Sequence, residues 1–259
     1  MPILVWIIIF TILGGLLSAL AASVLLLFSS QRRTGLLPHL VSFATGALLG
    51  AAFLGLLPHA LEGAGIDSYH EIGATVLIGI LVFFLLEKMV LWRHCHQDDC
   101  EAHGPSDKHR DSASGVMILV GDGLHNFLDG LLIAAAFLTD IHLGIVTSIA
   151  VIAHEIPQEV GDLAVLLNAG LNRARAFILN ILASLASVLG GIAGWFLLDQ
   201  ATEILPYVLA IAASSFLYIA VADLIPGLHR SVDGKASFQQ IALIAAGVLV
   251  VAITHQSVH

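Results

Sequence analysis

Charged residues are scarce in this chain. Asp, Glu, Lys and Arg make up 11% of its 259 residues, whereas soluble domains contain about 25%. This scarcity excludes an ordinary soluble protein. The 10 basic residues are outnumbered by 19 acidic ones, so no nucleic-acid partner is expected. The sequence also lacks a phosphate-binding P-loop, so nothing indicates a pump driven by ATP.

Apolar runs occupy nearly the whole sequence, because 58% of the residues are hydrophobic. About 20 apolar residues cross a bilayer, so the sequence predicts an all-α polytopic membrane protein, a single transmembrane domain over residues 1–259. The first run is expected to be a retained span, since no basic residue precedes it as in a secretory signal. The eight predicted spans form one bundle and cover about 3–28, 36–57, 72–92, 115–138, 142–168, 175–198, 206–227 and 238–254.

The basic residues fall into alternate loops or beside them. Lys and Arg near span ends stay on the cytoplasmic side, so this distribution predicts an even number of spans and extracytoplasmic termini. The opposite loops contain acids without basic residues, and that face is expected to attract cations; mere depletion of Lys and Arg is the alternative. The basic residues are Arg32, Arg33, Lys88, Arg93, Lys108, Arg110, Arg173, Arg175, Arg230 and Lys235. The acids of the opposite loops are Glu62, Asp67, Glu71, Asp140, Asp199 and Glu203.

The chain has only two cysteines, and both lie in the longest predicted loop, about 93–114. Thiols on the cytoplasmic side stay reduced, so a disulfide between them is not expected. Histidine, cysteine and carboxylate side chains suit weak capture of a borderline-soft metal ion. A polar loop without metal is the alternative, because the spacing matches no closed tetrahedral zinc site. The candidate ligands in this loop are His94, Cys95, His96 and Cys100.

Two polar stripes lie near the middle of the fourth and fifth spans. Positions i, i+3, i+4 and i+7 share one face of a helix. The stripe in the fourth span consists of Asp122, His125, Asn126 and Asp129. The stripe in the fifth span consists of His154, Glu155, Gln158, Glu159 and Asp162. Pro157 lies within the second stripe and deprives the carbonyl of Ala153 of its usual donor.

The negative charges of the acidic residues in these stripes must be compensated within the membrane. A charge at the bilayer centre costs about 2.5–3.5 kcal/mol on insertion scales, and neither stripe contains a basic residue. A bound cation would replace the lost hydration, and zinc accepts imidazole nitrogen together with carboxylate oxygen. The stripes therefore favour a divalent metal site at mid-membrane.

Other interpretations of the stripes stay open at this point. The polar groups could form hydrogen bonds between helices, or they could relay protons without a metal. The run from His154 to Gln158 also begins like the His-Glu-x-x-His motif of zinc proteases, although Gln158 replaces the second histidine and Pro157 would distort the helix. An intramembrane metal-dependent protease or a metal sensor is the alternative function.

Two strings within the stripes resemble the signature motifs of the ZIP (Zrt/Irt-like) metal transporters. They are His125-Asn126-Phe127-Leu128-Asp129-Gly130 and His154-Glu155-Ile156-Pro157-Gln158-Glu159-Val160-Gly161-Asp162. The eight spans, the outward termini and the His-rich loop after the third span are similar to that family too. The resemblance covers essentially the whole chain.

The resemblance implies transport of a divalent transition metal into the cytoplasm, zinc above all, with iron, manganese and cadmium as alternatives. The implied ligands are His125, Asn126, Asp129, His154, Glu155 and Gln158. Some family members hold two metals there, but the neutral amide of Gln158 is a poor bridge where relatives have His or Glu. Residues that could hold a further metal are Asp122, Glu159, Asp162, Asn180 and Asp223, besides the four in the loop.

The resemblance also implies an elevator-like movement of spans one, four, five and six against the other four, in a homodimer. No cofactor beyond the transported ion is expected, and the lipid bilayer is the other partner. The expected location is a plasma membrane or a bacterial inner membrane, with an organelle membrane as the alternative. Transport is expected to fail in acid, because the ligands must lose their protons to bind metal.

Short strings suggest an internal repeat. Leu56-Leu57-Pro58-His59 closes the second span and Leu224-Ile225-Pro226-Gly227 closes the seventh, and these spans run in opposite directions. Inverted repeats are usual in secondary transporters, although chance similarity is a rival explanation. Small residues are expected to allow tight helix contacts within the bundle at Gly46, Gly50, Gly130, Gly161, Gly190 and Gly194.

Overall fold

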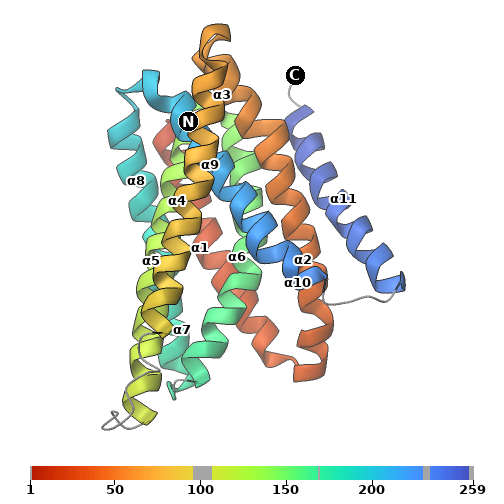
Figure 1. Ribbon diagram of the computed structural model, residues 1–259. Helices are drawn as coiled ribbons and strands as arrows, with labels where there is room; N and C mark the ends of the chain where they lie inside the picture. The colour runs from red at the N-terminus through yellow and green to blue at the C-terminus, as the bar shows by residue number, and fades with distance from the viewer. Residues whose placement is uncertain (1, 96–106, 169, 230–233, 257–259) are drawn as a thin grey trace.

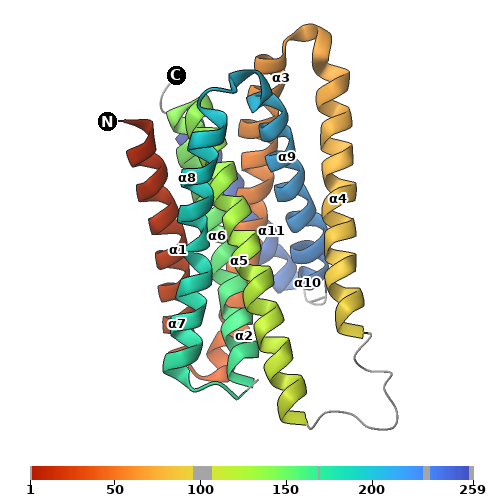
Figure 2. The same cartoon turned by 90° about the vertical axis from the view of Figure 1, so that its left-hand side faces the viewer.

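The computed structural model describes residues 2–95, 107–168, 170–229 and 234–256. Within these ranges every regular element is a helix, and the chain crosses the bundle eight times (Figures 1 and 2). Six of the crossings are long and apolar enough to span a membrane. The other two, α5 (Asp107–Thr139) and α6 (Ile141–Asn168), are 33 and 28 residues long and contain the two polar stripes. The predicted all-α membrane protein is confirmed.

The remaining crossings are built from one to four helical pieces. The first is α1 (Ile3–Leu27), the third is α4 (Tyr69–Cys95) after the short η2 (Ile66–Ser68), and the eighth is α11 (Gly234–Gln256). The second consists of α2 (Ser30–Gly50), η1 (Ala51–Leu56) and α3 (Leu57–Ala64). The sixth consists of α7 (Arg173–Ser184) and α8 (Ala186–Leu198). The seventh consists of η3 (Thr202–Ile204), α9 (Leu205–Tyr218), η4 (Ile219–Leu224) and α10 (Ile225–Leu228).

The loop predicted at 93–114 is shorter than expected. Helix α4 continues through Cys95 and helix α5 already begins at Asp107. Polar residues can stay helical beyond the apolar core of the membrane, so the prediction from hydropathy alone placed the boundaries wrongly.

Two π-helical turns occupy matching places in the second and seventh crossings. Both η1 and η4 are six residues long, and each ends two residues before a proline, Pro58 and Pro226 respectively. The N–H of Leu57 bonds to the carbonyl of Ala52, and the N–H of Ile225 bonds to the carbonyl of Ala220. A following proline cannot donate a helical hydrogen bond, which makes the wider turn tolerable there. This correspondence supports the predicted inverted repeat.

Both chain termini lie at the same end of the bundle (Figure 1). We call this the terminal end; it also contains Asp140, between α5 and α6. We call the opposite end, where α4 ends and α5 begins, the loop end. The described basic side chains all lie toward the loop end, at Arg32, Lys88, Arg173 and Arg175. The predicted even number of crossings is confirmed, whereas the side of the membrane that each end faces stays a prediction.

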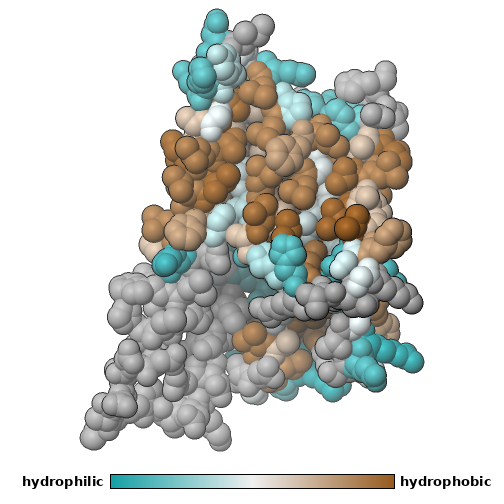
Figure 3. All heavy atoms as spheres, turned by 45° about the vertical axis from the view of Figure 1, so that its right-hand side comes forward, coloured by the Kyte–Doolittle hydropathy of each residue, from teal (hydrophilic) through white to brown (hydrophobic). Residues whose placement is uncertain are grey.

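On the face drawn in Figure 3, apolar side chains gather in a broad band, with hydrophilic ones toward the two ends of the bundle. Helix α4 contributes strongly to this band, because Leu77, Ile78 and Leu81 are each more than half exposed. Such exposed apolar surface is costly in water and favourable in lipid. The described surface is that of an integral membrane protein.

The helices pack in two groups. Helices α1, α5, α6, α7 and α8 contact one another, while α2, α4, α9 and α11 form the other group with η1 and α3. The groups meet mainly where α6 packs on α2, η1 and α11, and where α5 packs on α9. His125 and Gln158 of the polar stripes line a cavity together with residues of α4 and α9, such as Phe83 and Ser215, so this part of the stripes lies at the boundary between the two groups.

Glycines hold several of these helices close together. A Cβ atom added at Gly190 would lie 1.8 Å from the carbonyl oxygen of Phe127, and one at Gly130 would lie 1.8 Å from that of Ser187. The tight contacts predicted at Gly46, Gly50, Gly130, Gly190 and Gly194 are confirmed. The one predicted at Gly161 is wrong, because an added Cβ there meets nothing within 4 Å. Gly161 is exposed on the surface of α6.

Candidate metal centre

Four side chains from the two stripes converge between α5 and α6. His125, Asp129, His154 and Glu155 each offer one ligand atom, and these four atoms all lie within 4.8 Å of one another. We call them the first cluster. The side chains of Asp129, His154 and Glu155 are 1% exposed, and that of His125 is 25% exposed. Three ligands are thus withdrawn from solvent, and His125 is the accessible one.

The spacing of the first cluster suits a tetrahedral ion. The Nε2 atom of His125 lies 3.3 Å from Nε2 of His154, 3.3 Å from Oε1 of Glu155 and 3.8 Å from Oδ2 of Asp129. The Nε2 atom of His154 lies 3.3 Å from Oδ2 of Asp129 and 3.6 Å from Oε1 of Glu155. Ligands about 2.0–2.1 Å from a tetrahedral zinc lie about 3.3–3.4 Å apart. Small side-chain movements would therefore complete the coordination.

In the first cluster, carboxylate oxygens lack hydrogen-bond donors, and a hydrogen bond to the backbone orients one of the histidines. Nδ1 of His154 lies 3.1 Å from the carbonyl oxygen of Ala150, to which it can only donate, so His154 would turn the lone pair of Nε2 toward the cluster whenever Nε2 carries no proton. Oδ2 of Asp129 and both carboxylate oxygens of Glu155 are buried without a hydrogen-bond donor. Lone pairs gathered in this way need protons or a cation between them.

A second cluster shares Glu155 with the first. Asp122, Glu155 and Glu159 are all buried, and each offers a carboxylate oxygen within 4.8 Å of the others. Asn126 donates a hydrogen bond of 2.8 Å to Asp122, whose Oδ2 atom is buried without a partner. Three carboxylates this close repel one another unless protons or a cation intervene. A second cation next to the first would satisfy them.

Helix α7 supports the second cluster from the side. Asn180 donates a hydrogen bond to Oε2 of Glu159, and Ser184 donates one to Oε1. All three side chains are buried. Sequence reasoning singled out Asn180 but missed Ser184. The signal was present, since the two are four residues apart on one face of an apolar helix. These hydrogen bonds orient Glu159 toward the cluster.

The other predicted ligands lie outside the two clusters. Gln158 and Asp223 line a cavity of about 510 Å³ that also reaches His125. Asp162 lies beyond the second cluster on α6, and its Oδ2 atom is buried without a hydrogen-bond partner. The backbone of His94 and Cys95 belongs to α4, but their side chains, together with His96 and Cys100, lie outside the described residues.

The first cluster is accessible from the loop end. The cavity beside His125 is lined by late residues of α4, such as Met89, and early residues of α5, such as Gly121. Toward the terminal end the bundle is filled by Ile133 and Phe137 of α5, which are 1% exposed. The ring of Phe216 also lies 6.2 Å from that of His154. The described arrangement is thus open toward the loop end and packed toward the terminal end.

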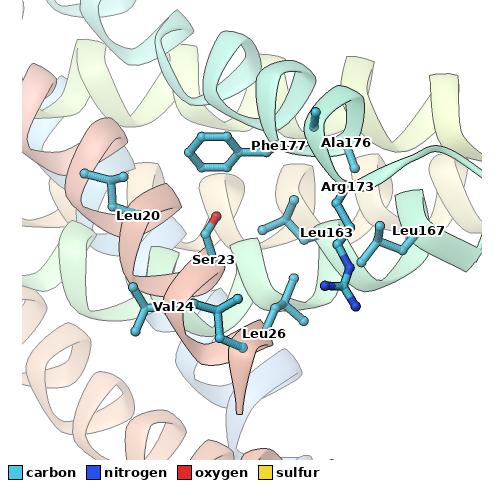
Figure 4. A pocket seen from close by; sticks show the side chains of 11 residues that line it. Leu20, Ser23, Val24, Leu26, Leu163, Leu167, Arg173, Ala176 and Phe177 are labelled. Carbon is cyan, nitrogen blue, oxygen red and sulfur yellow. The ribbon is translucent and has the colours of Figure 1, made fainter. Parts of the chain in front are cut away.

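A cavity of about 470 Å³ between α1, α6 and α7 has a different character (Figure 4). Its lining is apolar apart from Ser23 and Arg173. A cation would be repelled by the guanidinium group of Arg173 and would find no carboxylate or imidazole in this lining. This cavity therefore does not compete with the two clusters as a metal site.

The comparison with known families agrees with the two signature strings. The family profile of the ZIP zinc transporters matches residues 3–114 and 93–255. The chain belongs to the ZIP zinc transporter family. Members of this family are transporters rather than enzymes, so membership does not support the protease alternative.

Individual ZIP proteins are similar over most of the described chain. Zinc transporter ZIP13 of Pongo abelii is 37% identical over 231 residues, which is 84% of this chain and 66% of that protein. Zinc transporter ZIP13 of Homo sapiens is 33% identical over 262 residues, which is 84% of this chain and 70% of that protein. Zinc transporter ZIP10 of Mus musculus is 40% identical over 158 residues, 57% of this chain and 19% of its own length. The chain thus spans about two thirds of the length of the ZIP13 proteins that it matches.

Proposed function

We propose that this protein carries divalent transition-metal ions, zinc above all, across a membrane into the cytoplasm. The observation that supports this most directly is the near-tetrahedral set of two imidazoles and two carboxylates in the first cluster. Zinc accepts these ligands at this spacing. Iron and manganese prefer more ligands, while cadmium would need a wider set, so zinc fits best.

The second cluster supports a site for two ions. Glu155 offers one oxygen to each cluster, so it can bridge two cations, a role for which Gln158 is unsuited. Asp129 and the two histidines would complete the first ion, and Asp122 with Glu159 would complete the second. Neighbouring cations repel each other, which weakens binding and favours release, as conduction requires.

The division into two helix groups supports alternating access. The clusters lie on α5 and α6, in the group that also contains α1, α7 and α8, and the first cluster borders the other group, because the ring of Phe216 of α9 lies 6.2 Å from that of His154. A sliding movement of one group against the other would shift the clusters toward the terminal end. The clusters would then be open to the terminal end and closed to the loop end. The described arrangement corresponds to the state open to the cytoplasm, if the basic loop end faces the cytoplasm.

The membrane and the assembly belong to the same proposal. The protein lies in a plasma membrane or a bacterial inner membrane, or in an organelle membrane, with both termini on the side from which the metal comes. It functions as a homodimer. Chemical cross-linking in native membranes would test the dimer, and protease protection of terminal tags would test the orientation.

A hydrolytic enzyme fits the geometry less well. A catalytic zinc site keeps one position open for water, whereas four protein groups surround the centre of the first cluster. Gln158, at the position of the second histidine of the protease motif, lies in the cavity wall instead. A metal sensor would share the binding site but show no uptake.

The test is radioactive zinc uptake into sealed proteoliposomes. Asp129→Ala and His154→Ala are expected to reduce uptake at least tenfold relative to the parent protein. His39→Ala is the matched control, because His39 is an exposed histidine on α2, outside both clusters. If the parent binds zinc but shows no uptake above empty vesicles, the sensor becomes the better hypothesis.

A further inference from the structure

The cavity between α1, α6 and α7 lies at the loop end of the bundle, because α1 and α6 end there and α7 begins there. Its lining comes from residues 20–27 of α1, 163–167 of α6 and 173–177 of α7 (Figure 4). The volume of about 470 Å³ falls within the range of about 300–1,000 Å³ that ligand pockets usually have. No residue of the two clusters lines this cavity, so its ligand would differ from the transported metal.

The cavity opens from the side of the bundle toward the membrane. Leu20, Val24 and Leu27 of α1 are exposed at its edge, whereas Leu163 and Ala176 are buried at its floor. The distance along α1 from Leu20 to Leu27 is about 10 Å, and half of the hydrocarbon core of a membrane is about 15 Å thick. One leaflet therefore covers the whole opening, and its lipids are the molecules that can enter.

Ser23 places an unpartnered hydroxyl group in the lining. Its Oγ atom is buried and has no hydrogen-bond partner within the described part of the chain. The other two hydroxyl side chains of α1 behave differently, because Thr11 donates to the carbonyl of Ile7 and Ser18 donates to that of Gly14. A buried hydroxyl group without a partner is unfavourable. Ser23 therefore calls for an acceptor atom on a molecule in the cavity.

Arg173 gives the cavity a positive charge. Its side chain is exposed, and the described lining contains no acidic side chain that could pair with it. In Figure 4 the guanidinium group lies among the apolar side chains that surround the cavity. Guanidinium groups bind phosphate oxygens through two parallel hydrogen bonds, and basic pockets between membrane helices bind the head groups of anionic lipids. The charge of Arg173 thus favours a phosphate as its partner.

The lining changes with depth in the same order as the parts of a phospholipid. Arg173, the first residue of α7, lies nearest the loop end. Ser23 lies four residues, about 6 Å, before the last residue of α1, Leu27. Leu20 lies about one turn deeper than Ser23, and Phe177 lies about one turn deeper than Arg173. A phospholipid likewise has its phosphate at the membrane surface, its ester carbonyls next and its acyl chains deepest.

We propose that this cavity binds one anionic phospholipid from the leaflet at the loop end. Arg173 would bind the phosphate, and Ser23 would donate a hydrogen bond to an ester carbonyl. One acyl chain would lie against Leu163 and Phe177. The lipid would join α1 to α6 and α7, which belong to the same helix group as the clusters, and would stabilise their packing. This site goes beyond the proposed function and does not depend on metal transport.

The first test measures lipid binding to the purified protein by native mass spectrometry. Phosphatidylglycerol and phosphatidylcholine with the same acyl chains are added separately, and the parent is expected to bind the anionic lipid about tenfold more tightly. Arg173→Gln is expected to abolish this preference. Arg175→Gln is the matched control and is expected to keep it, because Arg175 is an exposed arginine of the same helix turn outside the lining. Equal affinity of the parent for both lipids, or the same loss in both variants, would overturn the proposal.

The second test concerns the hydroxyl group. Ser23→Ala is expected to weaken the binding of both lipids about threefold, because both contain the ester carbonyl that Ser23 would bind. Ser18→Ala is the control, since the hydroxyl group of Ser18 is already bonded within α1, and it is expected to change neither affinity. Unchanged lipid binding in Ser23→Ala would overturn the proposed binding mode.

A third measurement uses the wild-type protein in proteoliposomes, so it does not depend on the folding of any variant. Phosphatidylglycerol with a photoactivatable diazirine in its acyl chain is irradiated, and mass spectrometry identifies the labelled peptides. Labels are expected in residues 20–27 and 173–177, and excess unlabelled phosphatidylglycerol is expected to displace them more effectively than phosphatidylcholine does. Labels on the exposed face of α4, at Leu77 and Leu81, are expected to show no such selectivity. Labelling of α4 alone, or equal displacement by both lipids at the cavity, would overturn the proposal.

Discussion

Glu155 is the residue that joins the two clusters. Its two oxygens are buried without hydrogen-bond donors, and each cluster includes one of its carboxylate oxygens. Glu159 belongs only to the second cluster, where Asn180 and Ser184 orient it. The two glutamates are four residues apart on one helix and identical in chemistry, yet their surroundings assign them different roles.

Replacing these glutamates by glutamine tests the shared role. Glu159→Gln is expected to remove one bound zinc relative to wild type, because it removes a ligand from the second cluster alone. Glu155→Gln is expected to remove two and to reduce zinc uptake at least tenfold. Isothermal titration calorimetry of the purified protein measures both, with Glu203→Gln, an exposed acid at the terminal end, as control. If both variants lost the same number of bound zinc ions, Glu155 would not be a ligand shared by the two clusters.

At the scale of the elements, the position of α5 depends on its contact with α8. Gly130 and Gly190 bring the two backbones so close that neither helix can carry a side chain at that point. The contact lies next to Asp129, so it also sets how far the first cluster projects from the boundary. Small residues at such interfaces stabilise membrane helices through close packing.

Two alanine variants separate packing from helix propensity. Gly190→Ala is expected to destabilise the protein by about 1–3 kcal/mol, since the new methyl group overlaps the carbonyl of Phe127. Gly161→Ala is expected to stabilise it by about 0.5–1 kcal/mol, because the site is open and alanine favours the helix. Thermal unfolding in detergent compares the two. A similar loss of stability in both would refute the assigned contact.

At the scale of the whole molecule, the clusters are exposed to one end of the bundle only. Gly121 lines the cavity that leads from the loop end to His125. Ile133, on the other side of the first cluster, is 1% exposed. The asymmetry arises because the two helix groups are packed tightly around the terminal half of α5 and α6.

Cysteine accessibility tests this asymmetry. With Cys95 and Cys100 replaced by serine, Gly121→Cys is expected to react with a membrane-impermeant thiol reagent added on the side of the loop end. Ile133→Cys is the control, and it is expected to react from neither side. Mass-tag labelling in sealed right-side-out and inside-out vesicles measures both positions. Equal labelling of Gly121→Cys from both sides would contradict a stable state that is open only toward the loop end.

The sequence alone determined the eight crossings, the two polar stripes and the family resemblance. Hydropathy and helical periodicity are local properties, so they identify spans and show which residues share a face. They also placed His125, Asp129, His154 and Glu155 on facing stripes, which the structure brings together. The expectation that transport fails in acid stays a prediction.

Only the tertiary structure decided how the stripes divide. It placed Glu155 in both clusters, Gln158 in the wall of the cavity, and Ser184 within hydrogen-bonding distance of Glu159. Periodicity fixes the face of one helix but not its rotation, tilt or depth against another. Those depend on contacts between distant residues, such as Gly130 with Ser187, that no local pattern encodes.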